Sequence, residues 1–386
     1  MSAGRVDMPG RVIRILELRS VRGTGGGPEK TILLGAAQAD TSRFHVLVCY
    51  IRDQRDGTFS LGDRARALGV DYVEATERHS IDPGVFPQLT RIIRDHRIDL
   101  VHAHEYKTDL LALLLARRTG VVPLATAHGW TGQSGRERRL YYPADKWLLA
   151  RYPRVVAVST DIKDELVRAG ARPDRVTVIL NSIDPEAFRR DPSRIADIRS
   201  TLGFQPSDIV VGAVGRVEQQ KRFDLLLDAM VETFATRPTV QLAIVGDGSL
   251  LDAVKAHARA LGIADRCRFL GHRQDIADLH HAFDLFVQSS EYEGTPNAVL
   301  EAMAMETPLV VTDVGGTREL AEAGVHCLLV PSRDVPALHQ AIEAALGDPV
   351  TARQRAIAAR RRIETDLSFA QRTRRLESIY AEMVHA

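Results

Sequence analysis

Short apolar runs alternate with longer amphipathic segments along the 386 residues of this chain, and the series starts twice. This alternation is typical of parallel sheets wrapped by helices, because parallel strands need long crossover connections. The first series comprises Val12–Leu18, Phe44–Tyr50, Leu100–Ala103, Pro123–Thr126, Val155–Val158 and Val176–Ile179. The second comprises Ile209–Val214, Val240–Val245, Arg268–Leu270, Leu285–Gln288, Leu309–Val311 and Cys327–Val330. The restart predicts two doubly wound α/β domains.

The stretch Asp184–Asp208 separates the two series and is polar and interrupted by prolines. Since proline ends regular structure, we interpret this stretch as a linker region. We predict a first domain over residues 1–190 and a second over 191–365. Residues 366–386 form a final helix, because one apolar stripe of helical spacing runs through Phe369, Leu376, Tyr380 and Met383.

Composition excludes several classes of protein. A formal charge of +1 gives no basic footprint for nucleic acid. The run Leu110–Ala116 is too short to span a bilayer. The three cysteines, Cys49, Cys267 and Cys327, are odd in number and lie in or beside apolar runs. We therefore expect buried free thiols in a reducing cytoplasm, a view that agrees with an N-terminus without a signal peptide.

Two carboxylates, Glu293 and Glu301, stand eight positions apart around a Gly-Thr-Pro-Asn turn. Pro296 suits the first turn of a helix and Thr295 its N-cap. This places Glu293 in the loop before the helix and Glu301 in its second turn. The helix start favours an anion, whereas carboxylates there need hydroxyl groups to bind. A diphosphate together with hydroxyls describes a nucleotide sugar.

Basic residues and glycines follow the first two strands of the second series. Gly215-Arg216 and Lys221 come after Ile209–Val214, where a planar fork and a mobile charge together suit a diphosphate. Gly246-Asp247-Gly248 follows the next strand. A simple turn explains this tripeptide, but its place also suits a backbone contact to a nucleotide.

A glycine-rich loop, Gly25-Gly26-Gly27, follows the first strand of the chain. Glu29 excludes a Walker A loop, and Pro28 occupies the third glycine of the dinucleotide fingerprint. Glycines allow close approach of the backbone to a phosphate, and we favour a loop that contacts ligand over a merely flexible one.

Histidines end two consecutive strands of the first domain: His102 and His104 one, His128 the next. A lone histidine is usually structural, but three beside the same cleft suggest function. Zinc is conceivable, yet no cysteine or clustered carboxylate completes a ligand set. No aspartates stand two positions apart to hold a catalytic metal, so we expect none.

The segment Arg136–Arg154 mixes basic with aromatic and aliphatic residues. This mixture could mean contact with an anionic membrane surface. A half-buried helix explains it as well, and we place that interpretation first.

In this order, the motifs resemble glycosyltransferase family four, whose members are retaining enzymes of the GT-B fold. The resemblance spans nearly the whole chain and is carried by Gly25–Gly27, Thr126–His128, Val158-Ser159, Asn181–Asp184 with Phe188, Val214–Arg216 with Lys221, Gly246–Gly248, Phe269–Gly271, Glu293 to Glu301, and Thr312–Gly316. It implies two Rossmann-like domains and a last helix that crosses back to the first.

The resemblance also implies roles. Residues like Arg216 and Lys221 hold the donor diphosphate, and one like Glu301 takes the ribose hydroxyls. One like Glu293, with the amides after it, holds the donor sugar, and His128 lies near the anomeric centre. The catalytic set is then His128, Glu293, Arg216 and Lys221. The donor-binding set is Gly25, Gly26, Gly27, Gly215, Arg216, Lys221, Gly246, Asp247, Gly248, Glu293, Gly294, Thr295, Pro296, Asn297 and Glu301.

The expected function is transfer of a sugar, with retention, from a nucleotide sugar to a glycan or lipid-linked acceptor in surface polysaccharide synthesis. UDP is the expected nucleotide, and the donor sugar is a hexose or N-acetylhexosamine. Gly294-Thr295-Pro296-Asn297 departs from the commoner Gly-Phe-Gly pattern, so the sugar cannot be borrowed from relatives. Two alternatives stay open: a sugar-nucleotide epimerase of the same fold, and a catalytically silent nucleotide-sugar-binding protein. We expect a cytoplasmic protein, with peripheral contact at the inner membrane face as an option.

Overall fold

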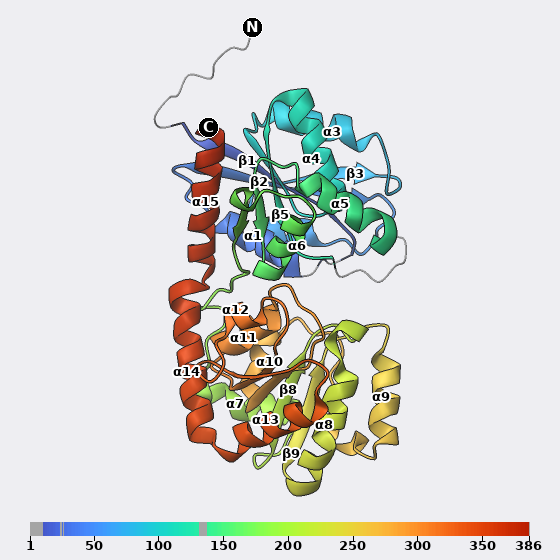
Figure 1. Ribbon diagram of the computed structural model, residues 1–386, viewed down its shortest axis with the longest axis vertical. Coiled ribbons are helices and arrows are strands. Elements are labelled where there is room, and N and C mark those ends of the chain that lie inside the picture. Colours follow the sequence, from blue (N-terminus) through green and yellow to red (C-terminus); the bar gives the residue numbers. More distant parts are fainter. Residues whose placement is uncertain (1–10, 24, 26, 131–136, 386) are drawn as a thin grey trace. The chain divides into compact units, whose positions relative to one another are not determined.

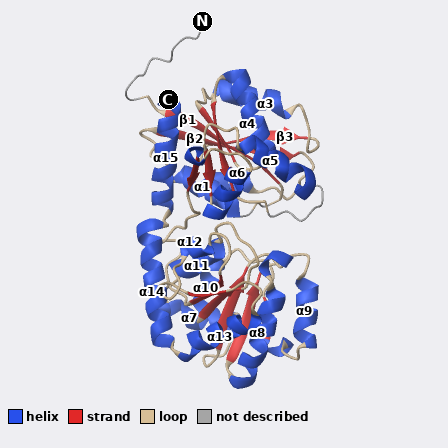
Figure 2. Ribbon diagram, in the orientation of Figure 1, coloured by secondary structure: helices blue, strands red, loops and turns tan. Residues whose placement is uncertain are grey.

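The computed structural model describes residues 11–23, 25, 27–130 and 137–385, and the side chains of residues 137 and 138 lie outside the description. Its internal contacts divide the chain into two units. The N-terminal unit comprises Met1–Leu180 with Phe369–Ala386, and the C-terminal unit comprises Asn181–Ser368. Each unit has a parallel sheet between helices (Figure 2). The predicted two α/β halves are confirmed.

In the described part of the N-terminal unit, seven strands pair in the order β3-β2-β1-β4-β5-β6-β7. Every pairing is parallel, so the carboxyl ends of all strands lie at one edge. The strands are β1 (Ile13–Val21), β2 (Phe44–Asp53), β3 (Tyr72–Glu77), β4 (Leu100–Ala103), β5 (Val122–Ala127), β6 (Val155–Ala157) and β7 (Val176–Val178). The strand β3 was not predicted, because it is an edge strand whose polar residues hide the apolar pattern.

Helices cover both faces of this sheet (Figure 1). They are α1 (Gly27–Ala37), α2 (Leu61–Ala67), α3 (Val85–Asp95), α4 (Tyr106–Thr119), α5 (Tyr142–Leu149), α6 (Thr160–Arg168) and α15 (Phe369–His385). Successive residues of a strand point to opposite faces. Accordingly, Ile15 joins a core with Leu376 of α15, whereas Leu16 joins a core with Leu89 of α3.

In the described part of the C-terminal unit, six strands pair in the order β10-β9-β8-β11-β12-β13, again in parallel. They are β8 (Ile209–Val214), β9 (Val240–Val245), β10 (Cys267–Phe269), β11 (Leu285–Gln288), β12 (Leu309–Thr312) and β13 (Leu328–Val330). The helices are α7 (Ile195–Thr201), α8 (Phe223–Thr236), α9 (Leu251–Ala260), α10 (Ile276–Ala282), α11 (Asn297–Ala304), α12 (Thr317–Leu320), α13 (Val335–Gly347) and α14 (Pro349–Asp366).

The segment Asp184–Asp208 is not a linker, and residues 181–190 do not belong with the first domain. Arg199 donates to Ala282 O at 3.0 Å, and Arg360 of α14 donates to Phe188 O at 2.6 Å. These bonds satisfy backbone carbonyls within the C-terminal unit, so the segment is an integral part of that unit. A composition rich in proline and charge could not reveal such contacts.

The last helix, α15, starts at Phe369, three residues later than expected, and groups with the N-terminal unit. Phe369, Leu376 and Tyr380 of the predicted stripe are buried, which confirms the stripe. Cys49 and Cys327 are buried free thiols, while Cys267 is half-buried. Within the described residues, no helix combines the length and apolarity that a bilayer crossing requires.

Candidate active site

Each sheet has a point where the chain reverses its direction of strand addition. In the C-terminal unit it lies between β8 and β11, and in the N-terminal unit between β1 and β4. Open parallel sheets bind ligands at this switch point, outside the carboxyl ends of the strands. The glycine-rich loop follows β1, Arg216 and Lys221 follow β8, and Glu293 follows β11, whereas Gly246–Gly248 follow β9 and His128 follows β5. The roles of these residues stay predictions.

In the C-terminal unit, the loops after β8 and β11 meet through Lys221 and Glu293. Lys221 Nζ lies 2.5 Å from Glu293 Oε1, and the two side chains are 14% and 7% exposed. Ser290 Oγ donates to the same carboxylate oxygen at 2.7 Å. Gln220 Nε2 and Gln288 Nε2 each donate to Glu293 at 3.3 Å. The carboxylate is thus held by several donors as well as by the lysine.

The backbone brings Lys221 to this point through an unusual turn. A short 3-10 helix, η4 (Gln219–Lys221), precedes Arg222, whose φ of 48° lies in the left-handed region. Arg222 is held there by Asp224 and Glu291. Arg216 is exposed, and its described hydrogen bond goes to Gln220 Oε1 at 3.3 Å. An exposed guanidinium whose described hydrogen bond goes to a neutral amide stays available to an anion.

Glycines allow the loops at this edge to pack backbone against backbone. A Cβ on Gly246 would lie 1.9 Å from Gly215 O, and a Cβ on Gly248 would lie 2.4 Å from Val217 O. Asp247 Oδ1 accepts from Gly248 N at 2.7 Å. These contacts give the Gly-Asp-Gly turn a packing role of its own, and its contact to a nucleotide stays a prediction.

Glu301 lies in the second turn of α11, as predicted, and is half-buried. The helix begins one residue later than expected, because Pro296 is the N-cap and Asn297 the first helical residue. Thr295 is therefore not the N-cap. Its side chain is buried, and its carbonyl accepts from Asn181 Nδ2 at 3.2 Å. Gly294 O accepts from Gly316 N at 2.7 Å, so the loop after β12 supports the loop before α11.

In the N-terminal unit, the glycine-rich loop connects β1 to α1, as predicted. Gly25 has a φ of 70°, and Gly27 is the first residue of α1. Gly26 lies outside the described residues. On the other side of the switch point, Glu105 caps α4 by accepting from the backbone N–H groups of Lys107 and Thr108.

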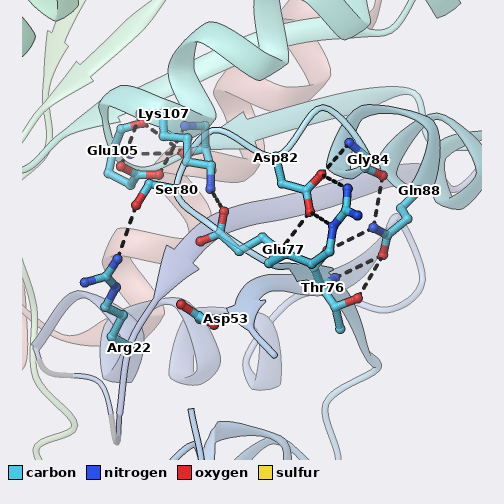
Figure 3. Close-up of polar contacts among 12 residues, drawn as sticks. Arg22, Asp53, Thr76, Glu77, Ser80, Asp82, Gly84, Gln88, Glu105 and Lys107 are labelled. Carbon is cyan, nitrogen blue, oxygen red and sulfur yellow. Dashed lines mark hydrogen bonds and ion pairs between the residues drawn. The ribbon is translucent and has the colours of Figure 1, made fainter. Parts of the chain in front are cut away.

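Figure 3 shows the polar contacts that hold the neighbouring loops at this edge. Arg22, just after β1, donates to Ser80 Oγ at 3.3 Å. Lys107 of α4 pairs with Glu77, the last residue of β3. These contacts connect the segments that follow β1 and β4 to the end of β3. They hold the loops at the carboxyl edge of the sheet in place.

The three histidines do lie together, and a carboxylate that sequence analysis missed joins them. Glu17 of β1 stands beside His102 of β4 in the strand register, with Oε1 3.2 Å from His102 Nδ1. Its Oε2 contacts His104 Nε2. His104 Nδ1 in turn lies 3.2 Å from His128 Nε2. The expectation that no carboxylate accompanies the histidines is therefore wrong.

The helix α15 completes this cluster from the far end of the sequence. Tyr380 donates its hydroxyl to Glu17 Oε1 at 2.8 Å. A cavity of about 20 Å³, enough for one water molecule, lies beside the histidines and is lined by Arg372 and Thr373 as well. Among the described atoms, Arg372 Nε and Thr373 Oγ1 are buried without a hydrogen-bond partner. A water in this cavity would suit both.

Glu17, His102 and His104 could in principle hold a metal ion, since their ligand atoms lie within 4.8 Å of one another. The same atoms are engaged in hydrogen bonds, however, with His102 Nε2 also 2.7 Å from Thr126 Oγ1. The pairing is complete without a metal. No signal in the sequence singled out Glu17, because one acidic residue in a strand resembles an exposed edge position.

Solved structures share this architecture. Alr3699/HepE from Anabaena, in complex with UDP-glucose, superposes with a TM-score of 0.82 over 96% of this chain and 100% of that chain, at 22% identity. WaaG, described as a glycosyltransferase involved in lipopolysaccharide biosynthesis, gives a TM-score of 0.72 over 95% and 99% at 16% identity. The two parallel sheets therefore form a GT-B fold.

The sequence comparisons are more specific. A family profile described as Glycosyltransferase Family 4 matches residues 25–187, and one described as Glycosyl transferases group 1 matches residues 208–348. A glycogen synthase of Mycobacterium tuberculosis H37Rv is 31% identical over 72% of this chain and 67% of its own. The putative glycosyltransferase EpsD of Bacillus subtilis is 30% identical over 69% and 73%. The protein belongs to glycosyltransferase family 4 and is a glycosyltransferase.

Proposed function

We propose that the protein transfers a hexose or N-acetylhexosamine from a UDP-sugar to a glycan or lipid-linked acceptor, with retention of anomeric configuration. The observation that carries this proposal is the pairing of Lys221 with Glu293, next to Arg216, across the switch point of the C-terminal sheet. Two cations there suit a diphosphate, and a carboxylate suits sugar hydroxyls.

Relatives support the donor and the setting. Alr3699/HepE from Anabaena has been crystallised with UDP and with UDP-glucose. A relative from Escherichia coli, 26% identical over 77% of this chain, is a UDP-Gal:alpha-D-GlcNAc-diphosphoundecaprenol alpha-1,3-galactosyltransferase. We extend these properties of the relatives to the present chain when we propose a lipid-linked acceptor and a role in surface polysaccharide synthesis.

The chemical task is to stabilise negative charge that develops on the departing UDP. Preorganised cations perform this task in a site that excludes water. We assign it to Arg216 and Lys221 and propose that no metal is needed. The expected outcome is full activity in EDTA. Activity that disappears in EDTA and returns with manganese or magnesium would overturn this assignment.

A screen of UDP-sugars by thermal shift, followed by incubation of each stabilising donor with glycan and lipid-linked acceptors, tests the function. Transfer gives a new glycoside, and its anomeric configuration by NMR decides retention. Release of an epimerised sugar without acceptor would instead identify an epimerase. Tight donor binding with no product under any condition would identify a silent binding protein.

Glu301 is proposed to bind the ribose of the donor. Glu301→Gln keeps the shape of the side chain and removes its charge, so calorimetry should show UDP binding weakened about tenfold. Glu232→Gln, at a position 79% exposed on α8, is the matched control and should bind UDP like the unmodified protein. Unchanged affinity in Glu301→Gln would show that Glu301 is only a helix residue.

We further propose that the N-terminal unit contacts an anionic membrane, as a protein bound peripherally at its cytoplasmic side. An apolar face runs along α4 through Tyr106, Leu110 and Leu114, all exposed. Tyr106 stacks on Tyr141, and the neighbouring Leu140 and Trp147 are 60% and 54% exposed. The helix α5 is half-buried, as the sequence favoured, since Asp145 and Leu149 are buried. The membrane proposal concerns the apolar side chains that stay exposed.

Basic residues surround this face, which we call the apolar–basic face. Arg151 lies over the Trp147 ring, 3.4 Å from its centroid, and Lys146 lies over Trp130. Arg117 and Arg118 end α4. An apolar surface with a basic rim is suited to lipid headgroups of negative charge. Arg136 of the predicted basic segment lies outside the described residues.

A further inference from the structure

The hydrogen bonds that run from Glu17 through His104 to His128 have a fixed donor and acceptor at each contact. The reason is that the protonation state of each group decides which of its atoms can donate. Burial raises the pKa of Glu17, but His102 and His104 hold it well below its usual range, so this carboxylate is ionised. An ionised carboxylate only accepts hydrogen bonds. Both of its oxygens have donors here: Oε1 accepts from Tyr380, and Oε2 faces His104 Nε2.

His104 and His128 are neutral. Burial lowers the pKa of His104 to about 4, and it lowers the pKa of His128 well below its ordinary value. A neutral imidazole has one N–H donor and one acceptor nitrogen. If one nitrogen of a ring donates a hydrogen bond, its other nitrogen must therefore accept one.

The polarity follows from the carboxylate outward. His104 must carry its proton on Nε2, since that nitrogen faces Glu17. Its Nδ1 is then an acceptor, and the facing His128 Nε2, 3.2 Å away, must be the donor. This leaves Nδ1 of His128 as the nitrogen with a free lone pair. No hydrogen bond to His128 Nδ1 occurs among the residues that the structure describes.

We propose that Glu17 and His104 are positioning residues that hold His128 as the Nε2–H tautomer, so that its Nδ1 accepts a hydrogen bond from a substrate hydroxyl. The proposal rests on the proposed transferase function and on the place near the anomeric centre that the family resemblance implies for His128. It adds that the tautomer of this ring is selected by Glu17 and His104, which act through hydrogen bonds that lead to the ring. Partners that fix the tautomer of a metal-bound histidine change activity about 10- to 100-fold when replaced, and we expect an effect of the same size for this ring.

The variant Glu17→Gln should reverse the donor and acceptor roles in every hydrogen bond from residue 17 through His104 to His128. The hydroxyl of Tyr380 donates to the Oε1 position, which favours the amide oxygen there and directs the amide NH2 toward His104. His104 Nε2 then becomes the acceptor and its proton moves to Nδ1. His128 Nε2 accepts in turn, and His128 Nδ1 presents an N–H where the native ring presents a lone pair.

Nitrogen-15 NMR of histidine-labelled full-length protein reads this directly, because protonated and unprotonated ring nitrogens differ strongly in chemical shift. The His128 signals are assigned by their loss in His128→Gln. We expect a protonated Nε2 and an unprotonated Nδ1 in the unmodified protein, and the reverse in Glu17→Gln. A protonated Nδ1 in the unmodified protein, or no change in the variant, would overturn the proposal.

Kinetics show whether the tautomer matters. UDP release from UDP-glucose, UDP-galactose and UDP-N-acetylglucosamine, with water as sugar acceptor, should fall about 10- to 100-fold in kcat in Glu17→Gln, with KM changed little. Asp99→Asn is the control, since Asp99 is a buried carboxylate at the amino end of β4 that bonds Arg11 and Arg14. It should leave both tautomers and kcat unchanged.

The remaining outcomes separate this inference from the proposed function. A reversed tautomer with unchanged kcat would overturn the positioning role while the transferase activity stands. No turnover of any UDP-sugar by the unmodified protein would count against the proposed function, and NMR would still decide the tautomer. One equivalent of zinc in the purified protein, removed by Glu17→Gln, would show a metal site and overturn the hydrogen-bonded chain. His104→Phe provides a second variant if Glu17→Gln does not fold, and it should also lower kcat.

Discussion

Lys221 Nζ and Glu293 Oε1 lie 2.5 Å apart, although the two residues are 72 positions apart in the sequence. The pair joins the loops on both sides of the switch point and is largely removed from solvent. Breaking a buried pair on one side leaves an uncompensated charge. Lys221 therefore serves both the fold and, by our proposal, the leaving diphosphate.

Lys221→Met should lose stability and activity for separate reasons. We expect a loss of about 3 kcal/mol in the free energy of unfolding, because Glu293 loses its countercharge. The double variant Lys221→Met/Glu293→Gln should regain most of this loss in urea unfolding but remain at least tenfold slower in UDP release. A double variant as unstable as the single one would contradict the pairing.

Arg216 offers the contrasting case. It is exposed and bonded within the described residues to Gln220, so Arg216→Met should change the free energy of unfolding by less than about 0.5 kcal/mol. UDP release should nevertheless fall at least tenfold, since a charge-assisted contact contributes about 1.5–3 kcal/mol. Normal turnover in folded Arg216→Met would remove the phosphate assignment.

The backbone of Gly315 packs directly against the backbone of Glu293. Its φ is 49°, and a Cβ there would lie 1.8 Å from Glu293 O. Gly315→Ala must therefore shift the backbone of Glu293, and we expect UDP release to fall at least tenfold. Gly324→Ala is the control, because Gly324 has a φ of 77° but no heavy atom within 4 Å of the added Cβ. It should cost about 1–3 kcal/mol in backbone strain and leave turnover in the folded protein intact.

Membrane contact through the apolar–basic face predicts binding to vesicles that contain anionic lipid. Trp147→Ser and Leu140→Ser should each reduce co-sedimentation with phosphatidylglycerol vesicles several-fold, because apolar area enters the interface. Val350→Ser is the matched control, since Val350 is 68% exposed on α14 of the other unit. Equal binding by all three variants, or equal binding to neutral vesicles, would contradict this contact.

His280 predicts acid sensitivity of folding. It is fully buried, neither ring nitrogen has a hydrogen-bond partner among the described residues, and burial lowers its pKa to about 3. The unfolded chain, with a histidine pKa of about 6.5, binds a proton that the folded protein excludes. The contribution of His280 to the free energy of unfolding is therefore fully present above pH 6.5. It decreases as the pH falls toward 3, and about 2 kcal/mol is lost at pH 5.

His280→Phe should remove this contribution. The ring packs against Phe283 and Phe286, so phenylalanine fits the same surroundings. The loss of unfolding free energy between pH 7 and pH 5, measured in urea, should be smaller in the variant by about 2 kcal/mol. An equal loss in both proteins would show that His280 is protonated in the folded state or remains neutral in the unfolded one.

The sequence by itself determined the two series of strands and the strand ends at which polar residues gather. Period and apolar content decide these features locally, which is why Leu100–Ala103 and Ile209–Val214 were predicted with their correct bounds. Polar surroundings concealed the edge strand β3, and prolines disguised Asp184–Asp208 as a linker. The composition of a segment does not predict which distant side chains donate hydrogen bonds to its backbone carbonyls.

Only the tertiary structure decided which polar groups meet. Glu17 and Tyr380 bond across 363 positions, and neither residue type nor spacing in the sequence predicts that contact. Lys221 and Glu293 were each expected at the site, but their pairing depends on the β8–β11 neighbourhood. A strand fixes where its own side chains point by its period, whereas the partner across the sheet is selected by the order in which all the strands pack.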